Sequence, residues 1–102
     1  MKAMSPRQHK VAAVVQQAVA MALLRGDVAS TLPLSRLTVA DVWLSPDLRL
    51  ARIYLQVPNE WNMQATLATV NAEITRPLRG VLGKAMANKF TPQLEFFAYG
   101  QL

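Results

Sequence analysis

Apolar side chains near the beginning of the chain recur with the period of an α-helix. Across residues 6–24 they stand four and three positions apart, at Val11, Val15, Ala18 and Ala22. This spacing places them on one face of a helix. Ser5 followed by Pro6 is typical of a helix start, because Ser caps the first turn and Pro lacks a donor that this turn could not use. With Gly26 as the stop, the sequence predicts a first helix from Pro6 to about Leu24.

The next apolar pattern alternates with a period of two and predicts a β-hairpin. Residues 37–44 and 49–57 are rich in β-branched and aromatic side chains, which favour strands. Between them, residues 45–48 (Ser-Pro-Asp-Leu) have the chemistry of a type I turn, in which Asp47 is expected to bond its own backbone. Alternation assigns six side chains to the core, namely Ala40, Val42, Leu44, Ala51, Ile53 and Leu55. It assigns four to the opposite face, namely Trp43, Arg52, Tyr54 and Gln56.

A longer helical pattern follows Asn62, which is a good N-cap. The apolar positions keep a 3.6-residue period at Met63, Leu67, Val70, Ile74, Leu78, Val81 or Leu82, and Ala85 or Met86. Pro77 interrupts this stretch, because it has no N–H to donate to the carbonyl of Glu73 and its ring clashes with that carbonyl. The sequence therefore predicts two helices joined at a kink, over residues 62–75 and 77–88.

The remaining pattern, over residues 93–99, predicts a short closing strand and completes the order α-β-β-α-kink-α-β. A lone hairpin is marginally stable in water, so the last strand is expected to join it in one three-stranded sheet with the helices on one face. A length of 102 residues fits one domain. We therefore expect a single α+β domain over residues 1–102, with residues 26–35 as a loop and residues 1–5 and 100–102 as flexible ends.

Composition narrows the class of function. Eleven Lys and Arg against six Asp and Glu give a net charge of +5, which favours a polyanionic partner such as nucleic acid or an anionic membrane. The absence of cysteine excludes disulfides, thiolate zinc sites and a cysteine nucleophile. His9 is the only histidine, and the scattered carboxylates form no recognisable acid–base pair. We therefore expect no enzyme, no metal site and no cofactor.

The chain also carries no membrane signal. None of its apolar runs approaches the ~20 residues that a bilayer-spanning helix needs. Its first ten residues contain Lys2, Arg7 and Lys10 but lead into an amphipathic segment without the small-residue cleavage pattern of a secretory signal. We therefore expect a cytoplasmic protein with no membrane partner.

Three segments of the chain resemble the ribosome-binding factor A family. The first is residues 42–54 (Val-Trp-Leu-Ser-Pro-Asp-Leu-Arg-Leu-Ala-Arg-Ile-Tyr), which is similar to the strand–turn–strand signature of that family. The second is residues 23–25 (Leu-Leu-Arg) at the end of the first helix. The third is residues 89–96 (Lys-Phe-Thr-Pro-Gln-Leu-Glu-Phe), which resembles the family's Pro-x-Leu-x-Phe last strand. A Ser-Pro-Asp turn alone is weak, but three signatures in order and at the right spacing are much more specific.

The resemblance implies a type II KH-like fold, no catalysis, and binding to the immature small (30S) ribosomal subunit through its 16S ribosomal RNA. It also implies a role in late maturation and processing of that RNA and in growth at low temperature. The chain departs from the family at the usual Ala-x-Gly kink, where it has Ile74, Thr75 and Arg76. We expect Pro77 to supply the kink instead and Arg76 to add a charge at the corner. The acidic Asp-x-Ser element common after the last strand is absent as well.

The strongest local signal for function is a run of positive charge. Between residues 74 and 92 there are four basic residues and no acidic one, namely Arg76, Arg79, Lys84 and Lys89. Such a helix face suits contact with phosphates, because each Lys or Arg can neutralise one phosphate and release counterions. Arg7 and Lys10 on the first helix extend the proposed RNA-binding set. The alternative is a solvated helix face whose C-terminal cations suit the helix dipole.

Two further motifs admit two interpretations each. Residues 80–83 (Gly-Val-Leu-Gly) spell the KH-loop motif, but the middle pair continues the apolar stripe of a helix, so we expect a packing role. Trp43, Arg52 and Tyr54 could stack on bases or meet a protein, or they could form ordinary cross-strand pairs. A protein–protein interaction module that uses this sheet face is therefore the alternative function. In either case we expect a monomer without a small-molecule substrate.

Overall fold

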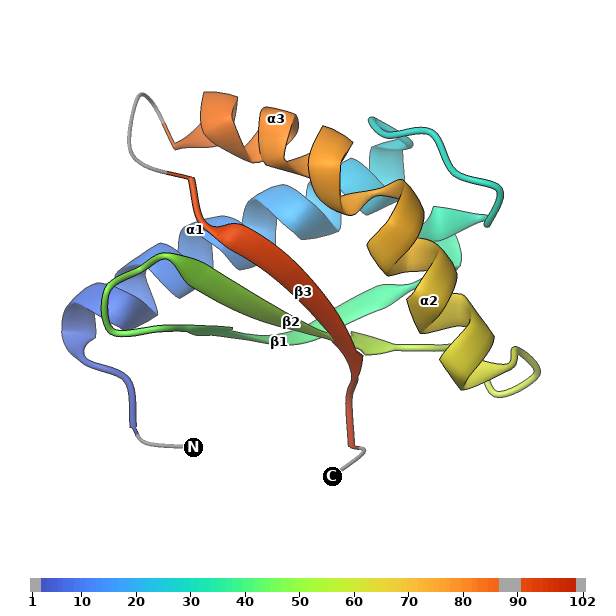
Figure 1. Cartoon of the computed structure of the whole chain (residues 1–102), viewed down its shortest axis with the longest axis horizontal. Helices are drawn as coiled ribbons and strands as arrows, with labels where there is room; N and C mark the ends of the chain where they lie inside the picture. The colour runs from blue at the N-terminus through green and yellow to red at the C-terminus, as the bar shows by residue number, and fades with distance from the viewer. Residues whose placement is uncertain (1–2, 87–90, 101–102) are drawn as a thin grey trace.

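The computed structural model describes residues 3–86 and 91–100. Its helices are α1 (Pro6–Arg25), α2 (Met63–Glu73) and α3 (Thr75–Ala85), with a short 3₁₀ turn, η1 (Leu34–Arg36). Its strands are β1 (Thr38–Leu44), β2 (Leu50–Gln56) and β3 (Gln93–Ala98). The sheet has the order β1-β2-β3, in which β2 pairs antiparallel with β1 and parallel with β3. The three helices gather on one side of this sheet (Figure 1), so the predicted α+β, type II KH-like architecture is confirmed.

The ends of α1 follow the predicted capping chemistry. Ser5 accepts a hydrogen bond from the backbone N–H of Gln8, and the Gln8 side chain accepts one from the N–H of Ser5. This reciprocal capping box satisfies two donors that a helix start would leave unpaired. At the other end Gly26 adopts a left-handed conformation with φ 72° and donates its N–H to the carbonyl of Ala22. Met4, just before the cap, packs against the hydrophobic core.

The hairpin turn forms as its sequence predicts. The N–H of Leu48 donates to the carbonyl of Ser45 at 2.9 Å. The carboxylate of Asp47 accepts from the Ser45 hydroxyl and from the N–H of Arg49, which is the expected bond to its own local backbone. Leu48 has a positive φ of 63°, which costs a non-glycine residue roughly 1–2 kcal/mol. Its side chain packs against the core, and that burial offsets the strain.

The two faces of the hairpin are as predicted except at Ala40. The other five inward positions, from Val42 to Leu55, are buried. Ala40 is only half-buried, because the register shifts between Val39 and Asp41, which pair with Leu55 and Tyr54. This β-bulge leaves Ala40 without a partner and reverses the pleat on its N-terminal side. The assignment of Ala40 to the core is therefore wrong, and Val39 packs against the core instead.

The helix break lies one turn before Pro77. Ile74 ends α2 and begins α3, with φ −113° and ψ −12°, so α3 starts two residues earlier than predicted. Pro77 falls in the first turn of α3, where its missing N–H costs little. It offers no donor to the carbonyl of Glu73, so the helical ladder is interrupted where the bend occurs. The predicted extension of this helix to position 88 reaches beyond the described residues.

The apolar stripe of the two helices is buried mainly around the break. Val70, Ile74, Leu78 and Leu82 are fully buried, whereas Met63, Leu67 and Val81 are half-buried. In the first turn of α2 the buried side chain is Thr66, which the apolar pattern missed. Its hydroxyl donates to the carbonyl of Asn62 at 2.7 Å, and this bond lets a polar group enter the core.

We predict that Gln8→Ala lowers the free energy of unfolding by about 1–3 kcal/mol. The buried amide of Gln8 donates to the carbonyl of Leu44 at 2.7 Å, and the variant leaves that carbonyl unpaired while it also breaks the capping box. Chemical denaturation of Gln8→Ala beside Gln17→Ala measures the effect. Gln17 is exposed on the same helix and should change stability by less than about 0.5 kcal/mol. Equal losses in the two variants would contradict the structural role of Gln8.

Candidate nucleic-acid interface

The cations predicted from the sequence lie on α1 and α3. Arg76, Arg79 and Lys84 are exposed on α3, and Arg7 and Lys10 are exposed in the first turns of α1. We call these five residues the cationic helix residues. The helix α3 packs against α1 and β3, and both helices lie on the same side of the sheet (Figure 1). Lys89, the remaining predicted RNA-binding residue, lies outside the described residues.

Positive charge on these two helices has no internal counter-charge. The sequences of α1 and α3 contain no Asp or Glu, and their basic residues are Arg7, Lys10, Arg25, Arg76, Arg79 and Lys84. Within the described part of the chain, none of the cationic helix residues forms an ion pair. Their charges are therefore directed to solvent and available to an anionic partner.

Arg79 has a structural contact that sequence reasoning missed. Its Nε donates to the carbonyl of Pro92 at 3.2 Å, and its Nη2 donates to the carbonyl of Thr91 at 3.1 Å. These two bonds tie α3 to the segment that leads into β3. They also fix the direction of the guanidinium, and three of its five N–H donors remain for another partner.

A shallow hollow lies beside this contact. It has a volume of about 270 Å³ and is lined by Thr75, Arg76, Arg79, Gln93 and Leu94. The bend at Ile74 brings the first turns of α3 over the start of β3, so two guanidinium groups border the same small space. A hollow with two cations and several polar groups suits a phosphate.

The carboxylate of Glu73, at the corner between α2 and α3, is occupied elsewhere. It accepts hydrogen bonds from the Ser30 hydroxyl at 2.6 Å and from both the N–H and the hydroxyl of Thr31 at 2.9 Å. The bond from Ser30 is the main cause that lowers the pKa of Glu73, followed by the bonds from Thr31. Among the described residues, Glu73 is held by the loop over residues 26–35 and forms no ion pair with Arg76.

The Gly-x-x-Gly motif is part of a helix, as expected. Gly80 and Gly83 both lie inside α3, and Leu82 between them is fully buried. A Cβ at Gly80 would meet open space, and one at Gly83 would lie 3.5 Å from the hydroxyl of Thr91. The backbone amides here serve the helix and do not form a loop that could clamp a nucleic-acid backbone.

The face of the sheet opposite the helices carries the second predicted group. The Arg52 guanidinium lies 4.9 Å from the centre of the Trp43 ring and 6.0 Å from that of Phe97. The rings of Tyr54 and Phe97 are stacked with centres 5.7 Å apart, and the Nε of Arg52 is 3.9 Å from Glu95. The structure thus joins Trp43, Arg52 and Tyr54 into one cluster. Sequence reasoning missed Phe97, although the alternation of β3 could have placed it outward.

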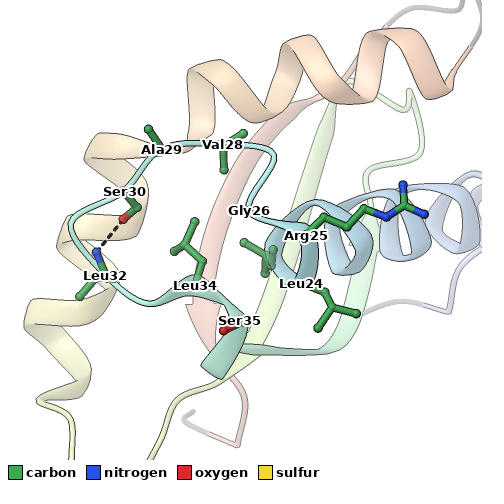
Figure 2. A pocket seen from close by; sticks show the side chains of 10 residues that line it. Leu24, Arg25, Gly26, Val28, Ala29, Ser30, Leu32, Leu34 and Ser35 are labelled. Atoms are coloured by element: carbon green, nitrogen blue, oxygen red, sulfur yellow. Dashed lines mark hydrogen bonds between the residues drawn. The ribbon is translucent and has the colours of Figure 1, made fainter.

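Another hollow lies between the end of α1 and the loop that follows it (Figure 2). It measures about 380 Å³, and Val28 and Leu34 are among the side chains that line it. The side chain of Arg25 extends away from it, as Figure 2 shows.

Across residues 3–86 and 91–100, no group of three or more His, Cys, Asp or Glu is arranged to hold a metal ion. Over the same residues, no helix combines the length and apolarity that crossing a lipid bilayer requires.

We predict that Arg79→Ala lowers the free energy of unfolding by about 1 kcal/mol, because two hydrogen bonds to backbone carbonyls are lost at a partly exposed site. Arg76→Ala should change it by less than about 0.5 kcal/mol, since Arg76 has no hydrogen-bond partner among the described residues. Urea denaturation of both variants measures the difference. Indistinguishable stabilities would show that the Arg79 contact does not stabilise the fold.

We predict that the contribution of Glu73 to stability fades in acid. Its folded-state pKa lies below the ordinary value of 4.5, so the carboxylate stabilises the fold fully above about pH 4.5 and less as the pH falls through the folded-state pKa. Thermal unfolding of the unmodified chain and of Glu73→Gln from pH 7 to pH 3 tests this. The gap between their unfolding midpoints should shrink toward acid, and a constant gap would count against the ionised carboxylate as its cause.

Comparisons with family models and with curated proteins identify the same family. Residues 7–99 match the family model described as Ribosome-binding factor A. The ribosome-binding factor A of Ruegeria pomeroyi is 34% identical over 93 residues, which cover 90% of this chain and 70% of that protein. The chain thus spans about two thirds of the length of such relatives.

Solved structures show the same fold. The crystal structure of ribosome-binding factor A from Thermus thermophilus matches 92% of this chain and 98% of its own, with a TM-score of 0.74 and 20% identity. A homology model of the Thermus thermophilus factor, fitted into a cryo-electron microscopy map of its complex with the 30S subunit, matches 85% of this chain and 89% of its own, with a TM-score of 0.65 and 23% identity. From the family match and the identity to curated relatives, the chain belongs to the ribosome-binding factor A family.

Proposed function

We propose that this protein binds the immature small ribosomal subunit through 16S ribosomal RNA and assists its late maturation and RNA processing. The observation that carries the proposal is that α1 and α3, which lie on the same side of the sheet (Figure 1), contain the five cationic helix residues and no carboxylate. Family membership supports it, since a relative has been fitted into a map of its 30S complex. We further propose that the protein acts as a cytoplasmic monomer and supports growth at low temperature.

The mechanism that we propose is occupancy. RNA phosphates would be held by Arg76 and Arg79 at the hollow beside the corner, with Lys84, Arg7 and Lys10 adding contacts along α3 and α1. Because the two carbonyl bonds of Arg79 already fix its guanidinium, little side-chain freedom is lost when it binds a phosphate. A bound protein stabilises whichever RNA conformation it prefers, and it leaves when maturation removes that conformation.

Three carboxylates are unsuited to the role of a general acid at neutral pH. A general acid at neutral pH needs a raised pKa, but three carboxylates have a lowered one. For Asp47 the first cause is the Ser45 hydroxyl, for Glu60 it is the residue's own backbone N–H, and for Glu73 it is the Ser30 hydroxyl. Each of these groups holds a turn or loop in place. The proposal accordingly includes no catalytic step and no cofactor.

A second candidate is a protein–protein interaction module on the open sheet face. It is favoured by the exposure of Phe97 and Tyr99, which are 39% and 52% accessible beside the Trp43–Arg52–Tyr54 cluster. The two functions differ in their response to salt. Counterion release makes the affinity for phosphates fall steeply as salt rises, whereas the affinity of an apolar interface depends little on salt.

The proposed function predicts selective, salt-sensitive binding to the small subunit. The purified protein is sedimented with isolated small subunits, large subunits and assembled ribosomes over a salt series. We expect binding to the small subunit alone, with an affinity that falls as salt rises. Failure to bind any particle at low salt would remove the assembly-factor proposal.

The double variant Arg76→Gln/Lys84→Gln localises the contact within the same experiment. It removes two cations that have no structural bond, and each lost phosphate contact lowers the slope of log affinity against log salt by about 0.7–0.9. The slope should therefore become shallower by roughly 1.5. Arg25→Gln, which removes one charge from α1 outside the proposed set, is the control for loss of a cation elsewhere on the helices. If the double variant keeps the original slope, Arg76 and Lys84 do not contact RNA.

A further inference from the structure

The sheet face turned away from the helices is unusually aromatic. Its outward positions include Trp43 on β1, Tyr54 on β2, Phe97 on β3 and Tyr99 just after β3. An antiparallel or mixed sheet that faces water on one side normally places polar residues there. Cross-strand packing accounts for the Trp43–Arg52 pair, but Phe97 and Tyr99 keep 39% and 52% of their surface exposed. Exposed aromatic clusters of this kind mark interaction surfaces.

The charge on this face is opposite to that on the helices. The three strands contain one cation, Arg52, and two carboxylates, Asp41 and Glu95. The guanidinium of Arg52 is already held between the Trp43 and Phe97 rings and beside Glu95. Asp41 is exposed and accepts one hydrogen bond from the N–H of Val42.

These charges disfavour a nucleic-acid ligand. A strand of RNA stacked on the aromatics would bring its phosphates near the exposed carboxylate of Asp41, and the one cation on the strands, Arg52, is already paired with Glu95, whereas binding of single strands depends on cations that track the backbone. A protein segment with apolar side chains and a Lys or Arg suits the face better, because it can cover the rings and neutralise Asp41.

The edge strand β3 restricts the ways in which such a segment can dock. The amide of Asn71 on α2 accepts from the N–H of Phe96 at 3.0 Å and donates to the carbonyl of Phe96 at 3.2 Å. This side chain takes the two backbone bonds that a neighbouring strand would make with Phe96. A partner is therefore directed onto the aromatic face and away from strand addition at β3.

We infer that the open sheet face docks a basic, partly apolar segment of a small-subunit protein, while the helix side contacts RNA. The identification of the partner as a small-subunit protein rests on the proposed function. Proteins that neutralise ribosomal RNA are rich in Lys and Arg, so they carry the charge that the exposed carboxylate of Asp41 complements. The protein would then sit between RNA and protein components of the particle.

Photo-crosslinking tests this in the full chain. One protein carries p-benzoylphenylalanine in place of Phe97, and a second carries it in place of Gly80, whose Cβ position on α3 faces open space. Each is bound to isolated small subunits, irradiated, and digested with nuclease or protease. We expect a nuclease-resistant protein adduct from position 97 and an RNA adduct from position 80.

Any other result contradicts either the proposed docking face or the proposed function. An RNA adduct from position 97, or no adduct there while position 80 crosslinks, would overturn the docking face and leave the RNA-binding function intact. If the unmodified chain does not co-sediment with small subunits at low salt, the proposed function fails, and the small-subunit partner fails with it.

Charge reversal tests the chemistry of the partner. Combined with the crosslinker at position 97, Asp41→Lys should lower the yield of the protein adduct about tenfold, because a basic segment would then meet a like charge. Asp27→Lys makes the same charge change at an exposed site after α1 and should leave the yield unchanged. Circular dichroism and thermal unfolding establish that both variants fold. Equal yields from the two would rule out a basic partner.

Discussion

Burial of Ile74 at the break between α2 and α3 is the constraint on which the rest of the arrangement depends. Its side chain is fully buried between Val70 and Leu78, which are buried as well. Burial of an aliphatic side chain stabilises by about 1.5–3 kcal/mol, more than an exposed ion pair at about 0–1 kcal/mol. The bend is thus held by the core, and surface charges are free to serve another purpose. It directs α3 back across α1 and sets the guanidinium groups of Arg76 and Arg79 over the start of β3.

The resulting molecule has two sides of different chemistry. The helix side carries cations without carboxylates on α1 and α3, and its corner carboxylate, Glu73, is bound by Ser30 and Thr31. The sheet side carries aromatic rings around Arg52 with carboxylates near them. The net charge of +5 understates the difference between the two sides, because α1 and α3 carry cations without carboxylates while the strands do not. Such separation suits the two proposed partners, RNA on the helix side and protein on the sheet side.

In the proposed function, Arg79 serves both stability and phosphate binding. Its two bonds to the carbonyls of Thr91 and Pro92 hold α3 against the segment that leads into β3. The same bonds orient the donors that remain for a phosphate. Variants of Arg76 or Lys84, whose side chains have no hydrogen bond among the described residues, would test the proposed RNA contact alone, whereas a variant of Arg79 would change stability as well.

The sequence by itself determined the element order, both caps of α1, the hairpin turn, the kinked helix pair and the family. These features are local: cap chemistry, apolar periodicity and the missing donor of Pro77 act within one or two turns of chain. Only the tertiary structure decided the bulge at Ala40, the bonds from the loop to Glu73, the amide of Asn71 on the β3 edge and the stacking of Phe97 on Tyr54. The loop and the Asn71 bonds join residues 43 and 25 positions apart. No local pattern encodes such pairs, because they exist only once packing of the core has brought distant segments together.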